Sequence, residues 1–262
     1  MATKKNNTEM KYGTTDVAVV PLRSTASEAG EMLSQLLFGE CFEILIVRQN
    51  WTKIKLSHDG YEGWIDTKTI TAISKEEYTK QIDSQSLIVS EPFIKVFCET
   101  NGWFFLPAGC CLPHVDGNSF TLAEKKYTLE KPLDCTVLSA TETAMQYLNS
   151  PYIWGGRTPW GIDCSGLTQT VYRILGMNIP RDANKQVGAG ESINMLFEAQ
   201  AGDLAFFDDK NGNITHVGML LGNGKIIHAS GKVRIDIIDH NGIYNSERKL
   251  YTHSLRVIKK IL

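Results

Sequence analysis

Cys164 stands in the segment WGIDCSG, residues 160–166, where its neighbours favour a reactive thiol. Leu167 and Val171 follow at helical spacing and Gly176 supplies a stop, so we expect a helix to begin near Cys164. Unpaired N–H groups and the positive end of the helix dipole favour a thiolate and can hold an oxyanion. The sequence therefore predicts a cysteine nucleophile of lowered pKa. A cysteine that merely packs at a helix end is the alternative interpretation.

Two histidines provide a candidate base for this nucleophile. His216 opens one predicted strand and His228 approaches the end of the next, with the turn GNGK, residues 222–225, between them. Antiparallel strands pair such ends, so we expect the two rings to be neighbours. One ring would take the proton of Cys164 while the other orients it. Core packing of each histidine is one alternative, and a zinc shell of Cys164, His216 and His228 is another.

The composition is that of a globular protein with two or three domains. The chain has 262 residues, of which 42% are hydrophobic and 21% charged, with a net charge of -2. No block of Lys and Arg marks a nucleic-acid surface, and the longest apolar runs are strand-sized. We therefore expect no nucleic-acid partner and no membrane span.

The cysteine pattern and the first residues bear on the compartment. Six cysteines, at positions 41, 98, 110, 111, 135 and 164, form no CxxC pair and no metal spacing, so we expect mostly reduced thiols. The start, MATKKNNTEMKYG, lacks the apolar segment of a signal peptide. A cytoplasmic protein is the expectation. A periplasmic or secreted protein, whose leader is missing from the given sequence, is the alternative.

Two small β-barrels are expected in the first half of the chain. Within residues 12–72, Ile54 and Leu56 alternate with lysines, SHDG marks a turn, and DVAVVPLRS reads as a strand ending at Pro21. Residues 76–133 repeat the rhythm of apolar strand, polar turn and aromatic strand in FIKVFCETNGWFFLPAG, so we predict a second SH3-like barrel there.

Residues 134–262 have the pattern of an α+β domain. Ser139 and Glu142 form a capping-box arrangement, which predicts a short helix reaching nearly to Asn149. The helix after Cys164 follows, and residues 202–239 then read as consecutive strands. Helices followed by strands predict an antiparallel sheet packed on helices.

These motifs together resemble the NlpC/P60 family of papain-like cysteine peptidases. The segments PYIWGG, GIDCSGLTQTVYRILGMNIPRDANKQ, GDLAFF and HVGMLLGNGKIIHAS occur in the family's order. The resemblance implies Cys164 as nucleophile, His216 as general base, His228 as the residue that orients it, and Tyr152 beside the oxyanion. It implies no cofactor and no metal.

The first barrel also resembles a known domain, the bacterial SH3 domain of the dipeptidyl-peptidase VI-like subfamily. GEMLSQLLFGECFEIL and DGYEGWI carry this resemblance. It implies that Glu31, Tyr61 and Asp163 hold the free amino group of an L-Ala residue. Each has a simpler alternative, which is a solvated charge for Glu31, barrel packing for Tyr61 and a helix cap for Asp163.

Further substrate contacts follow from the same resemblance. Ser165 beside the nucleophile, and Arg181 and Asp182 in PRDA, match family positions. Ala183 stands where relatives often carry serine, which removes one hydrogen bond to the D-Glu carboxylate. Other residues are expected to be structural or exposed, namely the Cys110–Cys111 pair and the surface histidines His58, His240 and His253; Trp154 and Trp160 receive no role.

The resemblance implies an endopeptidase that cuts the γ-D-glutamyl–diamino acid bond of murein peptides and releases L-Ala-γ-D-Glu. A free N-terminal L-Ala marks the substrate, and we expect a monomer. The alternatives are a cell-wall-binding module with a silent catalytic domain, and a papain-like amidase or acyltransferase acting on another substrate.

Overall fold

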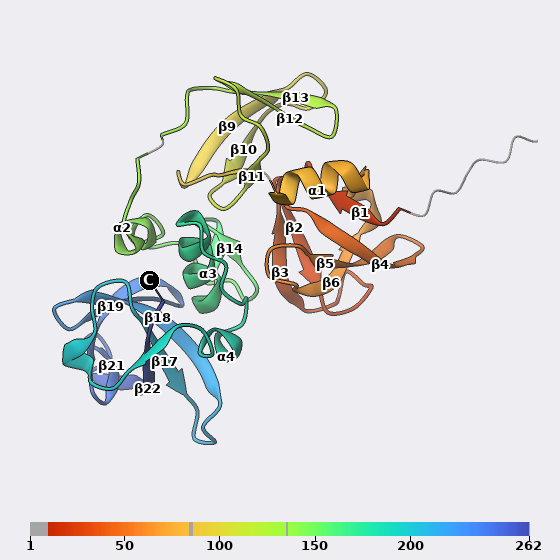
Figure 1. Ribbon diagram of the computed structural model, residues 1–262. Helices are drawn as coiled ribbons and strands as arrows, with labels where there is room; N and C mark the ends of the chain where they lie inside the picture. The colour runs from red at the N-terminus through yellow and green to blue at the C-terminus, as the bar shows by residue number, and fades with distance from the viewer. Residues whose placement is uncertain (1–9, 84–85, 135, 262) are drawn as a thin grey trace, which may run out of the picture.

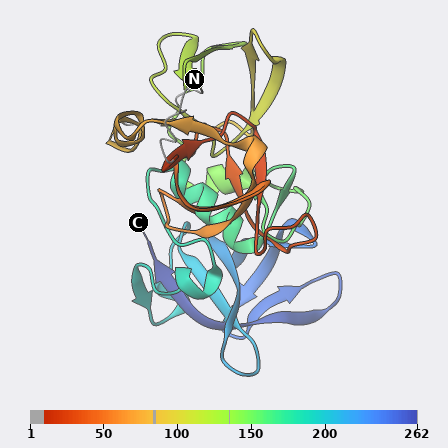
Figure 2. The same cartoon turned by 90° about the vertical axis from the view of Figure 1, so that its right-hand side faces the viewer.

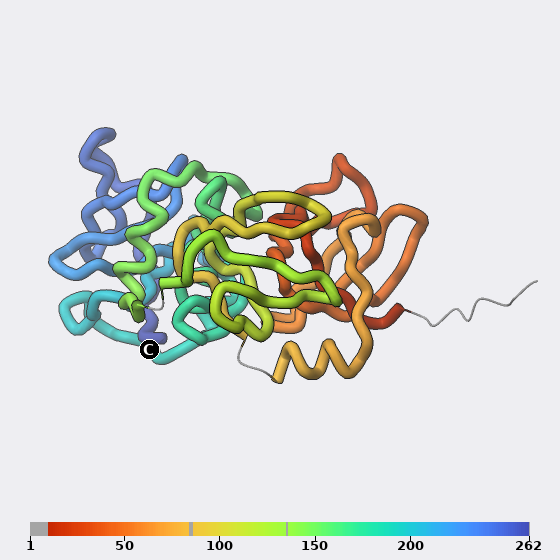
Figure 3. Tube along the Cα trace, turned by 90° about the horizontal axis from the view of Figure 1, so that it is seen from above, coloured from red at the N-terminus to blue at the C-terminus, as the bar shows by residue number. Residues whose placement is uncertain are grey.

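The computed structural model describes residues 10–83, 86–134 and 136–261. These residues form three successive β-rich units, which we call the first barrel (residues 12–73), the middle unit (75–129) and the C-terminal unit (140–260) (Figure 1). Figure 2 shows the sheets of the middle unit at the top and the C-terminal unit at the bottom, and Figure 3 shows the middle unit above the junction of the other two units. Cys135 lies outside the described residues, as do residues 1–9. No helix within the described ranges is long and apolar enough to cross a membrane.

The first barrel is a seven-stranded antiparallel sheet in the order β3-β2-β6-β5-β4-β1-β7. Its core includes Leu22, Phe42 and Ile54. The prediction that a strand ends at Pro21 is wrong, because β2 continues to Arg23. Strand β2 pairs with β6 only at Arg23, so the missing N–H of Pro21 removes no hydrogen bond to β6. The elements are β1 (Tyr12–Thr14), β2 (Val19–Arg23), β3 (Met32–Leu37), β4 (Phe42–Arg48), β5 (Trp51–Leu56), β6 (Glu62–Asp66), a 3₁₀ turn (Thr67–Thr69) and β7 (Thr71–Ile73).

The middle unit begins with a helix and continues as two small antiparallel sheets, β10-β9-β13-β12 and β11-β8. The expected hairpin of FIKVFC and GWFFLP is present as β9 and β10. Its core extends into the first barrel, because Leu37 and Phe38 pack within it. Whether residues 76–133 form a domain of their own stays a prediction. The elements are α1 (Lys75–Asp83), β8 (Leu87–Ile88), β9 (Phe93–Cys98), β10 (Gly102–Pro107), β11 (Cys111–Leu112), β12 (Ser119–Leu122) and β13 (Lys125–Leu129).

The C-terminal unit confirms the expected α+β pattern, with helices first and an antiparallel sheet after them. The sheet order is β16-β22-β17-β18-β19-β20-β21, and α3 packs on β18 and β19. The elements are α2 (Ala140–Met145), β14 (Arg157–Thr158), β15 (Gly161–Ile162), α3 (Cys164–Ile174), α4 (Ala183–Gln186), β16 (Glu191–Ile193), a 3₁₀ turn (Leu196–Glu198), β17 (Leu204–Asp208), β18 (Ile214–Gly222), β19 (Lys225–Ser230), β20 (Lys232–Asp239), β21 (Gly242–Asn245) and β22 (Leu250–Lys260).

Helices α2 and α3 begin at the residues that their N-caps predict. Ser139 accepts from the N–H of Glu142 and the Glu142 carboxylate accepts from the N–H of Ser139, which confirms the capping box of α2. That helix ends at Met145, earlier than expected, and Asn149 already has a positive φ of 70°. Helix α3 buries the predicted apolar face, and its end is followed by Gly176 at a φ of 81°.

A buried ion pair joins the first barrel to the C-terminal unit. Both oxygens of Glu40, which is 1% exposed, accept from Arg157 at 3.1 and 2.9 Å, and the N–H of Leu37 donates to it at 2.8 Å. Burial alone would raise the pKa of Glu40, but the charge of Arg157, with His58 and Arg173, holds it at about 2. The carboxylate therefore stays ionised across the physiological range.

His58 lies in this junction, so its expected surface position is wrong. Its side chain is largely buried and stands 3.8 Å from Glu40 and 3.4 Å from Asp59. Burial, with the charge of Arg173, lowers the pKa of His58 to about 3, so the ring is neutral at pH 7. The polar context of His58 in the sequence reflects buried ionic neighbours rather than solvent.

Replacing Glu40 by Gln tests the importance of this junction. We expect Glu40→Gln to lower the free energy of unfolding by about 3–5 kcal/mol, because Arg157 keeps a buried charge without its counter-ion. Urea denaturation followed by fluorescence measures the change. Glu62→Gln is the matched control, because Glu62 pairs with Lys53 on the exposed face of the same barrel and should cause no measurable change. Equal midpoints for both variants would contradict the prediction.

Candidate active site

Helix α3 starts at Cys164, as the sequence predicts, and Asp163 caps it. Asp163 Oδ1 accepts from the N–H of Gly166 at 2.6 Å. A Cβ at Gly166 would lie 2.2 Å from the carbonyl oxygen of Gly156, so only glycine fits there. This contact holds the loop of residues 151–162 against the first turn of the helix.

Asp163 and Arg181 form a buried pair that leaves neither group free. Arg181, 2% exposed, donates from Nη1 to Asp163 Oδ1 at 3.0 Å and from Nη2 to Asp163 Oδ2 at 2.6 Å. Its other N–H groups donate to Ser165 Oγ, Gly156 O and, in the first barrel, Ser34 Oγ. All five N–H groups of Arg181 thus have protein partners. The expected direct contact of Arg181 with substrate stays a prediction, and it would require one of these hydrogen bonds to break.

The Cys164 thiol is buried, with the residue 5% exposed. Burial and the nearby Asp163 charge raise the pKa of Cys164 to about 11, although the N–H groups of Val217 and Ser165 donate to the sulfur and oppose this. The expectation of a lowered pKa is therefore wrong. The helix terminus is present, but desolvation of the sulfur outweighs its effect. The Val217 contact also places the sulfur beside the strand residue that follows His216.

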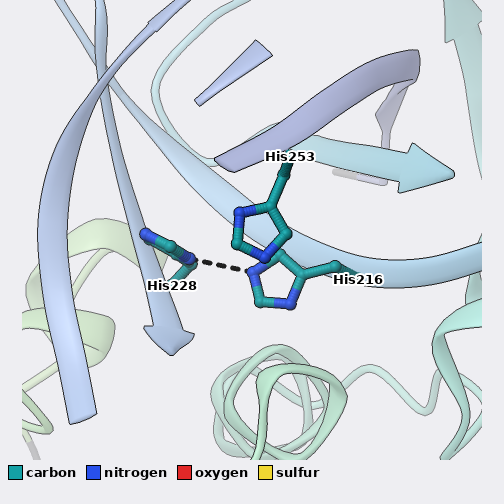
Figure 4. A group of neighbouring side chains, drawn as sticks. All are labelled: His216, His228 and His253. Carbon is teal, nitrogen blue, oxygen red and sulfur yellow. Dashed lines mark hydrogen bonds between the residues drawn. The ribbon is translucent and has the colours of Figure 1, made fainter. Parts of the chain in front are cut away.

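The two predicted histidines are neighbours, which confirms the strand argument. His216 on β18 and His228 on β19 approach with Nε2 and Nδ1 at 2.8 Å, as Figure 4 shows. A Cβ on Gly218 would lie 2.9 Å from the Cβ of His228, so this glycine leaves room for the ring. Burial, with the other two histidines nearby, lowers the pKa of His216 well below its usual value. His216 is therefore a neutral ring at pH 7.

A carboxylate that the sequence analysis missed fixes the orientation of both rings. His228 Nε2 lies 3.1 Å from Asp236 Oδ2, and Arg234 donates to both oxygens of Asp236 at 2.8 and 3.0 Å. Although burial raises the pKa of Asp236, bonds to His228 and Arg234 hold it below its usual value. His228 pairs with Arg234 across β19 and β20, which puts Asp236 in the diagonal position next to His228. The alternation of residues in KVRIDIID could have predicted that Arg234 and Asp236 share a face of the sheet.

This chain of hydrogen bonds determines which nitrogen of His216 can act as a base. A carboxylate only accepts, so His228 carries its proton on Nε2 and presents a lone pair at Nδ1. His216 must then donate from Nε2, which leaves Nδ1 unprotonated. In Figure 4 this Nδ1 points away from His228, toward the helix drawn below it. The lone pair of His216 therefore faces the side of the sheet covered by α3.

A third histidine joins the pair, because His253, which was expected at the surface, is partly buried. Its ring, carried by β22, stacks on His216 with centroids 4.1 Å apart and planes at 23°. Burial lowers the pKa of His253 to about 4. One ring nitrogen from each of His216, His228 and His253 lies within 4.8 Å of the others. Cys164 is not in this group. The structure therefore groups His216 and His228 with His253, and not with Cys164 as the zinc alternative required.

Tyr152 and Tyr61 are two further predicted site residues. Burial, followed by the Cys164 and Asp163 charges, raises the pKa of Tyr152 to about 12, so its phenol is neutral at pH 7. Tyr61 donates from its hydroxyl to Asp182 at 3.0 Å, across the two units. Burial raises the pKa of Tyr61, so the phenol is neutral.

Glu31 reaches the loop that precedes the nucleophile. Its carboxylate accepts from Trp154 Nε1 at 2.8 Å. Trp154 is 59% exposed and Trp160 is 47% exposed, so neither is a core residue. Ala183 opens the short helix α4 and offers no hydroxyl. The Glu31–Trp154 and Tyr61–Asp182 bonds thus each link the first barrel to the C-terminal unit, and a contact of these residues with substrate stays a prediction.

Comparison with known proteins gives the same organisation. Residues 149–254 match the NlpC/P60 family, and residues 22–70 match the bacterial dipeptidyl-peptidase SH3 domain. A γ-D-glutamyl-L-lysine dipeptidyl-peptidase of Bacillus cereus is 26% identical over 82% of this chain and 72% of its own. The protein of the same name from Bacillus subtilis is 27% identical over 75% and 71%.

Solved structures agree with the fold. The crystal structure of an NlpC/P60 family protein from Bacillus cereus has a TM-score of 0.80 at 21% identity, and it covers 96% of this chain and 99% of its own. A novel NlpC/P60 endopeptidase from Photobacterium damselae has a TM-score of 0.67 at 16% identity and covers 96% and 71%. The chain therefore carries an NlpC/P60 domain at residues 149–254 and, ahead of it, a bacterial SH3 domain at residues 22–70.

Proposed function

We propose that this protein is a cysteine endopeptidase that cleaves the γ-D-glutamyl–diamino acid bond of murein peptides and releases L-Ala-γ-D-Glu. The observation that carries the proposal is the position of Cys164 at the start of α3, the helix that packs on the strands β18 and β19 that bear His216 and His228. The two Bacillus relatives, aligned over 82% and 75% of this chain, are named γ-D-glutamyl-L-lysine dipeptidyl-peptidases, and these names suggest the substrate class. No step of the reaction requires a cofactor.

The first half of the reaction transfers the acyl group to Cys164. The sulfur attacks the carbonyl carbon of γ-D-Glu while its proton passes to His216 Nδ1, which is the unprotonated nitrogen. His228 and Asp236 stabilise the imidazolium that forms. We assign the stabilisation of the oxyanion to the backbone N–H groups at the start of α3 and to the neutral phenol of Tyr152.

The second half returns the enzyme to its starting state. His216 gives its proton to the leaving amine of the diamino acid, and the carbon–nitrogen bond breaks. Water then attacks the thioester, with His216 again taking a proton. The thiol is regenerated and L-Ala-γ-D-Glu leaves with a free carboxylate.

We further propose that the barrel selects peptides with a free N-terminal amine. A buried ammonium needs acceptors to replace water, and Glu31 with the oxygen of Tyr61 supplies them. Asp163 is less able to take part directly, because Gly155, Gly166, Ser165 and Arg181 already donate to it. Its negative charge is also compensated by Arg181. Glu31 is therefore the carboxylate that we assign to the amine.

The assignment of compartment and assembly is also a proposal. Five described cysteines, Cys41, Cys98, Cys110, Cys111 and Cys164, are free, which agrees with a reducing compartment. We propose a cytoplasmic monomer acting on released murein peptides. Export of a longer precursor is the competing possibility.

A pair of peptides tests the proposed activity and its selectivity. We expect cleavage of L-Ala-γ-D-Glu-L-Lys or its meso-diaminopimelate counterpart, and no cleavage of the N-acetylated forms, when products are followed by mass spectrometry. Glu31→Gln should lower kcat/KM on the free peptide by about 10–100-fold, because one charge-assisted bond to the ammonium is weakened. Glu28→Gln, a change at an exposed carboxylate on the same loop, should have no effect.

The outcomes separate the parts of this proposal. Equal cleavage of free and acetylated peptides would contradict amine recognition while leaving the peptidase intact. Cleavage of neither would overturn the proposed substrate. Activity that persists in Cys164→Ala would show that Cys164 is not the nucleophile.

Alkylation of Cys164 tests the protonation state of the resting pair. A thiol of raised pKa facing a neutral imidazole should react slowly with iodoacetamide at pH 7, with a rate that rises about tenfold per pH unit up to pH 10. Peptide mass spectrometry follows Cys164 separately from the other thiols. His216→Gln should give nearly the same profile. A rate that stays constant between pH 6 and pH 9 and depends on His216 would instead indicate a thiolate–imidazolium pair.

Asp236 provides a test of the hydrogen-bonded chain. In Asp236→Asn an amide N–H can face His228, which would reverse its tautomer and leave a proton on His216 Nδ1. We expect kcat to fall about 10–100-fold with little change in KM. Asp239→Asn is the control, because Asp239 is on the same strand but pairs with Tyr251 at the surface. Unchanged kcat in Asp236→Asn would exclude a role for this carboxylate.

A further inference from the structure

Three histidines from three strands converge beside the nucleophile. One nitrogen from each of His216 on β18, His228 on β19 and His253 on β22 lies within 4.8 Å of the others (Figure 4). The peptidase mechanism uses only the first two. His253 is in contact with His216 and with Phe207, and it has no part in proton transfer.

The far sides of two of these rings are anchored in the manner of metal ligands. His228 Nε2 pairs with Asp236 at 3.1 Å, and His253 Nδ1 pairs with Thr252 Oγ1 at 2.8 Å. Histidines that bind metals typically donate their second N–H to an oxygen, which fixes the ring and the tautomer. The nitrogens left over are His228 Nδ1 and His253 Nε2. Both belong to imidazoles, which are preferred ligands of zinc.

His253 is only partly buried, which gives an ion access from solvent.

We propose that His216, His228 and His253 form a site for a divalent transition-metal ion of the zinc class, and that the bound ion inhibits the enzyme. Zinc–nitrogen bonds of about 2.0–2.1 Å require the His216–His228 nitrogens to separate beyond their 2.8 Å hydrogen bond. The His253 ring must turn out of its stack on His216 to aim Nε2 at the ion. Water completes a four-coordinate shell.

Inhibition follows from the loss of the base. Metal binding at His216 Nε2 moves the ring proton to Nδ1, with no net gain or loss of protons. Nδ1 then presents an N–H toward Cys164 and can no longer accept its proton. The binding claim stands on the histidines alone, whereas the inhibition claim rests on the proposed peptidase function. The ion is an inhibitor here and has no place in the reaction.

Calorimetry tests the binding without any need for activity. Metal-free Cys164→Ala protein, which lacks the nucleophilic thiol, is titrated with ZnCl₂, and we expect one ion per chain. His253→Phe in the same background keeps an aromatic ring against His216 but removes the nitrogen, and it should weaken binding at least tenfold. His240→Phe, at an exposed histidine of the same unit, should bind as the parent does.

A spectroscopic measurement keeps the proposal testable if the protein carrying both Cys164→Ala and His253→Phe does not fold. Co²⁺ bound to the Cys164→Ala protein should give the visible absorption of a four-coordinate site, which ZnCl₂ then displaces. No saturable binding of either ion, or equal affinity with and without His253, would overturn the site.

Activity then tests the consequence. ZnCl₂ should inhibit cleavage of the free tripeptide by the wild-type enzyme, and a chelator should restore it. His253→Phe, compared with its own uninhibited rate, should need at least tenfold more ZnCl₂. Binding by calorimetry without cleavage of any tripeptide would reject the proposed function and leave the metal site standing. Cleavage with identical zinc sensitivity in His253→Phe would reject the inference alone.

Discussion

The buried pair of Asp163 and Arg181 is the interaction on which the rest of the site depends. Asp163 caps the nucleophile helix and holds the N–H of Gly155 in the preceding loop at 2.8 Å. Arg181 neutralises this carboxylate and reaches Ser34 in the first barrel. One ionic contact thus aligns the helix, the loop and the barrel. A carboxylate this deeply buried persists only because each of its lone pairs is occupied.

Burial also explains the chemical character of the site. Desolvation raises the pKa of Cys164 and lowers the pKa of His216, so both groups are neutral at rest. In the proposed mechanism, reactivity then depends on the direction of the His216 lone pair rather than on a thiolate present at rest. Asp236 and His228 set that direction through their protons. For the proposed reactivity of Cys164, the hydrogen-bonded residues of the sheet are therefore more important than the dipole of helix α3.

Local signals predicted much of this from the sequence. The capping box at Ser139, the helix from Cys164 and the hairpin that pairs His216 with His228 each depend on neighbouring residues or short-range periodicity. The features that could not be predicted from the sequence depend on long-range packing. His253 joins the site because β22 returns across the sheet beside β17, and His58 is buried because two units close over it. Likewise, no spacing rule reveals that every N–H of Arg181 is already used.

The shared core of the first barrel and middle unit makes each depend on the other. Phe38 directly follows β3 of the barrel, and its ring lies against Phe104, Phe120 and Tyr127 of the middle unit. Deleting either unit would expose these aromatic side chains to water. A shortened protein that keeps the barrel therefore has to keep the middle unit as well.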